Sequence, residues 1–150
     1  MIYYRLTSAE TGLYLGVRES SPSNIVGGFS LDEVSEPRNN IHVVWVIPQR
    51  LDGAQTGAID ALIRSQTFRL ANGYEKIEVD GRIYDVLTVG NSPDGDSLRF
   101  TVSKHHNGFY TIQPANDRKA YLSIPPGQVA PHPRVICGHK LFYWKLELNT

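Results

Sequence analysis

The sequence predicts an all-β fold of three similar units within one domain, residues 1–150. Three observations support this prediction. The chain contains 13 glycines, nine prolines and eight tyrosines but one methionine, a composition typical of short strands joined by turns. A two-strand segment repeats at a fixed offset, and several strands each carry one large aromatic residue.

The repeated segment lies near both ends of the chain. A shift of 107 positions aligns the following pairs without a gap: Ile2 with Phe109, Tyr3 with Tyr110, Tyr14 with Tyr121, Leu15 with Leu122 and Gly16 with Ser123. Each copy contains an alternating strand, a polar turn and a second strand with Tyr-Leu.

Each unit also ends in a strand that carries an aromatic residue. Trp45 lies in residues 42–47, Trp144 lies 99 positions later, and Phe100 lies between them. Three units of about 50 residues that end in this way predict a pseudo-threefold β-trefoil of twelve strands.

Residue patterns predict where these strands lie. In the first and third units we expect strands at residues 2–6, 13–17, 28–34, 42–47, 109–113, 120–124, 134–137 and 141–148. In the middle unit we expect them at residues 67–70, 76–79, 82–89 and 97–102, with turns at 80–81 and 91–95. Residues 57–64 have apolar positions spaced as in a short helix.

Charge and cysteine content argue against several classes of function. Fifteen basic residues balance 15 acidic ones, so no net field draws the chain to nucleic acid or to an anionic membrane. Cys137 is the only cysteine, so neither an internal disulfide nor a cysteine-rich metal site is possible. Residues 1–5 do not resemble a secretion signal, and the longest apolar run is residues 43–47. We expect a soluble cytoplasmic protein without a cofactor.

The histidines and the cysteine give weak signals for catalysis. His105 and His106 precede an Asn-Gly turn, where exposed residues collect. His132 and His139 flank Cys137, and a Cys-His pair can form a nucleophile. The apolar neighbours of Cys137 instead favour a buried thiol that packs as a small hydrophobe.

The remaining chemical groups also favour structural roles. No phosphate loop, zinc-type spacing or Gly-x-Ser-x-Gly elbow is present. Adjacent carboxylates at residues 32–33 would point to opposite faces of a strand, and those at 94–96 lie in a turn. Trp45 and Trp144 could stack on sugars, but their apolar strands favour core packing. We therefore expect a protein that is not an enzyme and has no metal site.

Polar loops are the better candidates for function, because binding residues concentrate on the loops of rigid scaffolds. Three loops stand out: residues 18–26, 35–40 and 125–134. The first begins with Arg18 and contains Asn24 and Ile25, and the second presents Arg38 after a proline. The third has four prolines, which hold an extended backbone at low entropic cost. Each loop could also be a solvated connection.

Five segments carry a resemblance to a known family: residues 45–47, 56–60, 109–113, 123–129 and 144–146. They resemble the mushroom β-trefoil peptidase inhibitors, most closely the cospin-like serine protease inhibitors and more loosely the mycocypin cysteine protease inhibitors. The resemblance covers most of the chain. It implies a small intracellular fungal defence protein whose loop enters the active site of a protease.

The resemblance also implies which loop is inhibitory. Cospin-like inhibitors place an arginine from the loop between the second and third strands in a trypsin-like S1 pocket, and residues 18–26 correspond to that loop. The candidate reactive-site residues are Arg18, Asn24, Ile25 and Arg38. An arginine would pair with an S1 aspartate through a bidentate contact, which predicts a trypsin-like serine protease as the partner. Arg18 stands at the strand edge, however, and Asn24 would suit an asparagine-specific cysteine protease, as in some mycocypins.

The alternative function is that of a carbohydrate-binding β-trefoil lectin, with a glycan as the partner. Ricin-type repeats carry a glutamine two residues before the tryptophan, and here those positions hold Val43 and Phe142. The ricin-type signal is therefore absent, although other trefoil lectins lack it too. A toxin or an interaction module is a third alternative.

Overall fold

The computed structural model describes residues 3–19, 24–47, 57–63, 69–90, 98–125, 128 and 133–149, with the backbone alone at 57–62, 73 and 74. The first unit contains β1 (Tyr3–Ser8), β2 (Tyr14–Arg18), β3 (Ile25–Phe29), α1 (Leu31–Ser35), the 3₁₀ turn η1 (Pro37–Asn39), β4 (Ile41–His42) and β5 (Trp45–Val46). The second contains β6 (Gly57–Leu62), β7 (Arg69–Val79), β8 (Arg82–Gly90) and β9 (Arg99–Lys104). The third contains β10 (Tyr110–Pro114), β11 (Tyr121–Ser123), β12 (Ile136–Gly138) and β13 (Trp144–Leu148).

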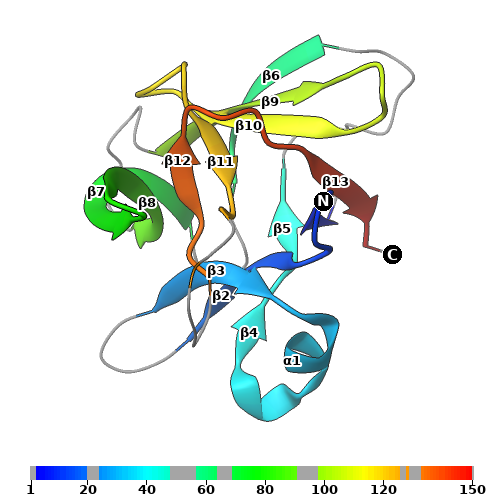
Figure 1. Ribbon diagram of the computed structural model, residues 1–150. Coiled ribbons are helices and arrows are strands. Elements are labelled where there is room, and N and C mark those ends of the chain that lie inside the picture. Colours follow the sequence, from blue (N-terminus) through cyan, green and yellow to red (C-terminus); the bar gives the residue numbers. More distant parts are fainter. Residues whose placement is uncertain are drawn as a thin grey trace.

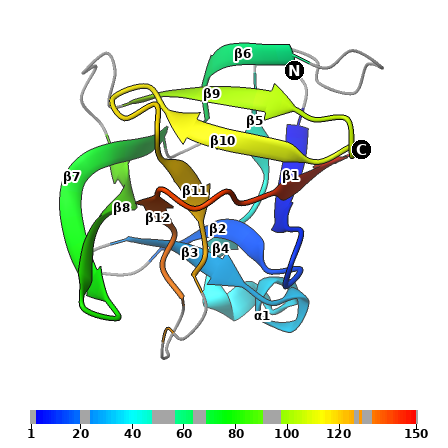
Figure 2. The same cartoon turned by 45° about the horizontal axis from the view of Figure 1, so that its top comes forward.

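The outer strands of the three units pair with one another. They follow the order β5-β1-β13-β10-β9-β6, with antiparallel pairing at each step. β1 pairs with β13 from Tyr4↔Leu148 to Ser8↔Trp144, so the first and last strands lie side by side (Figure 1). The inner strands form the hairpins β2–β3, β7–β8 and β11–β12, and β12 also pairs with β8. Figure 2 shows β7 and β8 at one side of the molecule and β9 and β10 across its top.

The core repeats one tryptophan interaction. Trp45 is fully buried, and its indole Nε1 donates a 2.9 Å hydrogen bond to the carbonyl oxygen of Leu15. Trp144 is also fully buried and donates a 2.9 Å bond to the carbonyl of Leu122. Because Leu15 and Leu122 are related by the 107-residue offset, the sequence repeat is confirmed as a repeat of structure. Phe100, which has no N–H to donate, is buried in the same core.

The strand predicted at residues 28–34 is wrong after residue 29, and the observed strand begins earlier, at Ile25. β3 ends at Phe29, and residues 31–35 form α1 instead. The Ser30 hydroxyl accepts from the Glu33 N–H at 3.2 Å, while the Glu33 carboxylate accepts from the Ser30 N–H at 3.0 Å. This reciprocal capping box satisfies backbone donors that a helix start would leave open. The carboxylates at residues 32–33 therefore lie in a helix, and Glu33 has a structural role.

Replacing Ser30 by alanine is expected to lower the free energy of unfolding by about 1 kcal/mol, because α1 loses its N-cap acceptor. Urea denaturation followed by circular dichroism measures this change. A Ser35→Ala variant at the exposed last position of α1 is the matched control. Equal stability of the two variants would contradict a stabilising role for the cap.

The middle unit differs from expectation in two places. The apolar spacing of residues 57–64 predicts a short helix, but residues 57–62 form β6. This strand pairs with β9 over six positions, so strand pairing outweighs the local spacing. The strands predicted at 67–70 and 76–79 are parts of one strand, β7, whose register shifts between Ala71 and Glu75. The predicted turn at Asp80 and Gly81 is confirmed, with φ of 51° and 77°.

The strand predicted at residues 42–47 is split in two. β4 pairs with β2, whereas β5 pairs with β1. Together with the additional strand β6 and the merging of two expected strands into β7, this division gives thirteen strands among the described residues where twelve were expected. The turn expected at residues 91–95 lies outside the described residues. No helix in the described ranges is long and apolar enough to span a membrane.

Candidate functional site

The hairpin β2–β3 holds the first predicted loop at both ends. Five residue pairs join the two strands, from Tyr14↔Phe29 to Arg18↔Ile25. Arg18 and Ile25 are thus strand residues that face each other where the hairpin opens, and the connecting segment is residues 19–24. Asn24 precedes β3, and residues 20–23 lie outside the described residues.

The other edge of β2 is also occupied where this segment begins. Val17 pairs with His42 and Arg18 pairs with Ile41, both in β4. The Glu19 N–H donates a 3.0 Å hydrogen bond to the Asn40 carbonyl. The Glu19 carboxylate lies 3.2 Å from His42 Nε2. The start of the connection is therefore fixed by strands on both sides.

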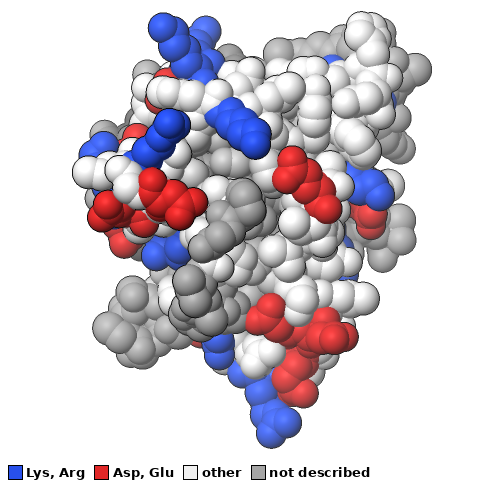
Figure 3. Space-filling model, viewed as in Figure 1, with Lys and Arg blue, Asp and Glu red and all other residues white. Residues whose placement is uncertain are grey.

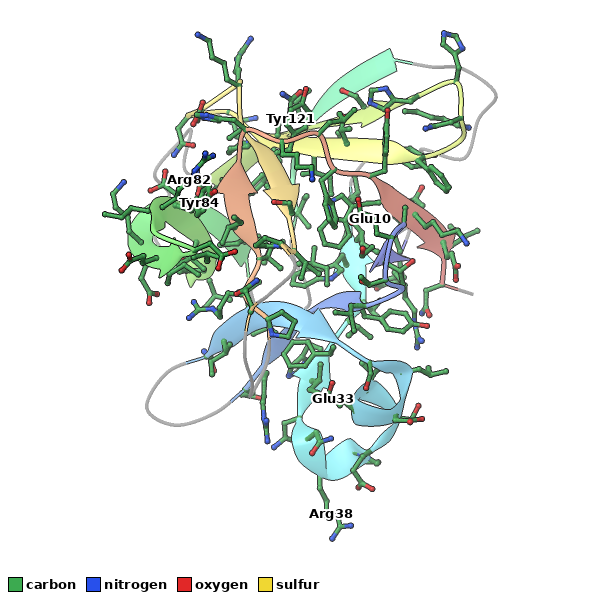
Figure 4. The ribbon with its side chains drawn as sticks, viewed as in Figure 1. Glu10, Glu33, Arg38, Arg82, Tyr84 and Tyr121 are labelled. Atoms are coloured by element: carbon green, nitrogen blue, oxygen red, sulfur yellow. The ribbon has the colours of Figure 1, made fainter. Side chains whose placement is uncertain are left out.

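Arg38 lies on η1, the 3₁₀ turn between α1 and β4. Its side chain is 89% exposed, and its Nε donates to the Glu36 carboxylate at 3.2 Å. The turn ends at Asn40, which adopts a left-handed conformation with φ of 52°. Figure 4 shows Arg38 pointing away from the molecule at the end opposite Tyr121. Arg38 is accessible, but its backbone is coiled where a protease substrate would be extended.

The described residues of the proline-rich loop, 125, 128, 133 and 134, include one that contacts both of the other units. Arg134 Nε donates a 3.3 Å bond to the Val26 carbonyl of the first unit, and its guanidinium lies 3.7 Å from Glu75 of the second. Gln128 bonds the Arg134 backbone through both its amide oxygen and its amide nitrogen, each at 2.9 Å. Residues 126–127 and 129–132, which include His132, lie outside the described residues.

The histidine and cysteine candidates form no catalytic pair in the described part of the chain. Cys137 is buried, and burial, followed by the charges of Asp85 and Asp117, raises the pKa of its thiol. His139 Nε2 lies 3.4 Å from Asp117 Oδ2 on the exposed surface. His105 Nε2 is 2.8 Å from Thr111 Oγ1. Among the described residues, no three His, Cys, Asp or Glu side chains gather as metal ligands.

Cys137 is expected to resist a disulfide-exchange reagent at about pH 8 in the folded protein, because a buried neutral thiol is a poor nucleophile. Because the pKa of Cys137 is higher in the folded protein than in the unfolded chain, its contribution to the free energy of unfolding is complete below the ordinary thiol pKa of about 8.5. This contribution decreases as the pH rises above that value. Release of the reagent's chromophore measures the reaction, and denatured protein is the control. Equal rates for folded and denatured protein would contradict burial of the thiol.

A cleft of about 780 Å³ lies beside β12, a volume within the range of small-ligand sites. The sequence did not predict this cleft because its lining comes from segments far apart in the chain. These segments are β7, β8, the turn that follows β1, the residues around β11, and residues 136–142. Figure 4 shows Arg82 and Tyr84 on one side of β12 and Glu10 on the other. Figure 3 shows basic and acidic side chains interspersed with uncharged surface on this face of the molecule.

The cleft combines exposed apolar groups with balanced charge. Ile83 and Leu141, two of the exposed large hydrophobic residues in the described part of the chain, line it together with the ring of Tyr84. Its charged residues are three basic and three acidic: Lys76, Arg82, Lys140, Glu10, Asp85 and Asp117. The arrangement can hold a ligand that has both apolar and hydrogen-bonding surfaces.

Comparison with solved structures identifies the architecture. The designed threefold symmetric protein ThreeFoil superposes with a TM-score of 0.68 and 16% identity, over 99% of each chain. Cry35Ab1 gives a TM-score of 0.69 and 13% identity, over 99% of this chain and 36% of its own. A GlcNAcα1-4Gal-releasing endo-β-galactosidase from Clostridium perfringens gives 0.64 and 14%, over 100% of this chain and 33% of its own.

These likenesses confirm the predicted all-β, β-trefoil fold, and at such low identity they show the fold alone. The chain spans about a third of the length of Cry35Ab1 and of the galactosidase. The sequence matches no protein-family model and no curated protein.

Proposed function

We propose that this chain is a protease inhibitor that presents residues 19–24 to the active site of its target. One observation carries the proposal: β2 is paired with β3 on one edge and with β4 on the other where this segment begins. Anchors of this kind reduce the conformational entropy that a binding segment loses on association, which strengthens binding. The sequence resemblance to cospin-like inhibitors and mycocypins supports the same function and implies a cytoplasmic fungal defence protein.

The backbone around each candidate residue bears on the identity of the target. A substrate-like residue must offer its backbone to the protease in extended form, as a strand is added to a sheet. Arg18 already pairs with Ile25 and Ile41, and Arg38 lies in a 3₁₀ turn. Asn24 lies before the first residue of β3. Because Arg18 is held by strand pairing and Arg38 lies in a turn, we propose Asn24 as the reactive residue, and with it an asparagine-specific cysteine protease in place of the trypsin-like serine protease that an arginine would imply.

Inhibition assays against legumain, papain, trypsin, chymotrypsin and subtilisin test the proposal. We expect legumain to be slowed, and we expect Asn24→Ala to weaken this inhibition at least tenfold, because recognition concentrates in a few interface residues. Arg38→Ala is the matched control, since it changes an exposed residue outside the segment, and it is expected to leave inhibition unchanged.

The other outcomes distinguish the alternatives. Inhibition of trypsin that is lost in Arg18→Ala would keep the inhibitor but assign it a serine protease. Inhibition that is lost only in Arg38→Ala would move the site to η1. No slowing of any of the five proteases at micromolar concentration would overturn the proposed function.

A further inference from the structure

Beside β12 the cleft is lined by the face of the β11–β12 hairpin opposite the core cluster, and the residues of this face are themselves largely buried. Leu122 and Cys137 pair with each other and belong to the core cluster. Because side chains alternate along strands, Ser123, Ile136 and Gly138 lie on the opposite face. A Cβ atom at Gly138 would lie 3.6 Å from Tyr84 Cε1 and 3.7 Å from Ser123 Oγ. A side chain at position 138 would therefore extend from between these two hydroxyl-bearing residues, and Gly138 leaves both of them uncovered on that side.

Several polar groups that line the cleft have no partner within the described part of the chain. The hydroxyls of Tyr84 and Ser123 form no hydrogen bond there, and Glu10, Arg82 and Lys140 form no ion pair there. The other two acidic residues are partnered: Asp85 lies 2.9 Å from Lys76 Nζ, and Asp117 lies 3.4 Å from His139 Nε2. A ligand thus meets hydroxyl groups that donate and accept, two free cations and one free carboxylate.

The apolar lining is exposed beside these polar groups. Ile83 is 72% exposed and Leu141 is 47% exposed, so both present apolar surface to the solvent at the cleft. The half-buried ring of Tyr84 adds an aromatic surface. A ligand that covers these side chains removes apolar surface from water while its polar edge bonds the free groups.

We infer that this cleft binds a neutral saccharide, independently of protease inhibition at residues 19–24. A sugar ring has an apolar C–H face for Tyr84 and Ile83, and each of its hydroxyls both donates and accepts hydrogen bonds. Because basic and acidic lining residues balance, a strongly charged ligand gains little net attraction. The volume of about 780 Å³ accommodates a mono- or disaccharide.

A glycan array that carries neutral and acidic saccharides tests this inference, followed by calorimetry with the free terminal sugar of each retained glycan. The decisive variant is Gly138→Leu, whose side chain would occupy the space beside Tyr84. We expect Gly138→Leu and Tyr84→Ala each to weaken binding of a neutral saccharide at least tenfold. A melting temperature near that of the original protein verifies that each variant folds, and retained protease inhibition gives a second check.

Two control variants separate the cleft from other surfaces. Leu31→Ser changes an exposed hydrophobic residue on α1, outside the cleft, and should leave saccharide binding unchanged. Asn24→Ala should also leave it unchanged, so failure of the inhibitor proposal and failure of this one are distinguishable.

Four results would overturn the inference. The first is that the protein binds no glycan on the array, and the second is that it binds acidic glycans alone. The third is that Gly138→Leu binds saccharide as well as the original protein does. The fourth is that the protein binds no glycan but binds members of a peptide library, and that Gly138→Leu weakens this peptide binding. The last result would assign the cleft to a peptide instead.

Discussion

Replacing Trp144 by alanine is expected to lower the free energy of unfolding by about 3–5 kcal/mol, enough to unfold a marginally stable domain. The indole is fully buried, and its ring centre lies 5.3 Å from that of Phe142. Truncation removes this packing, opens a cavity and leaves the Leu122 carbonyl without its 2.9 Å donor. Urea denaturation followed by circular dichroism measures the loss.

Trp144→Phe separates the two contributions. It keeps an aromatic ring but removes the N–H donor, so we expect a loss of about 1–3 kcal/mol from the unsatisfied carbonyl and the smaller ring. Phe100 shows that a phenyl ring is accommodated elsewhere in the same core. A Trp144→Ala protein within 1 kcal/mol of the original would contradict a structural role for the repeated tryptophan interaction.

The repeat made the architecture predictable from the sequence. The offset that aligns Leu15 with Leu122 implies that their backbone carbonyls occupy equivalent positions in two units. The indole N–H groups of the two tryptophans do donate hydrogen bonds to these two carbonyls. The strand ends were less predictable, because they depend on partners far along the chain. Residues 57–62 form a strand through pairing with β9, and the Ser30–Glu33 capping box ends the extended segment after β3.

The two candidate sites differ in how far sequence could locate them. Residues 19–24 connect consecutive strands, so local turn composition was enough to find a loop there, although the pairing of Arg18 and Ile25 set its ends. The cleft depends on Tyr84 and Gly138 approaching from different units. No local sequence pattern predicts that these two residues lie close together, so the cleft could be located only in the folded structure.

Gly16 provides a prediction that sequence alone does not make, because it lies where β2 is paired with β3 and close to residues 41 and 43. A Cβ atom there would lie 2.9 Å from Phe29 Cδ2 and 3.1 Å from Ile41 Cγ2 and from Val43 Cγ1. Phe29 is fully buried and Val43 is nearly so, which limits how far either can move.

Gly16→Val is therefore expected to lower the free energy of unfolding by about 3 kcal/mol through overpacking, despite the strand propensity of valine. Gly138→Val is the matched control: it is also a strand glycine, but its Cβ would meet only ordinary contacts of 3.5 to 3.7 Å. We expect Gly138→Val to stay within about 1 kcal/mol of the original protein. Urea denaturation of both variants measures the difference, and equal losses would mean that the two glycines have similar surroundings. A large difference would show that Gly16 is required by the close approach of three hydrophobic side chains, whereas the surroundings of Gly138 accommodate an added side chain.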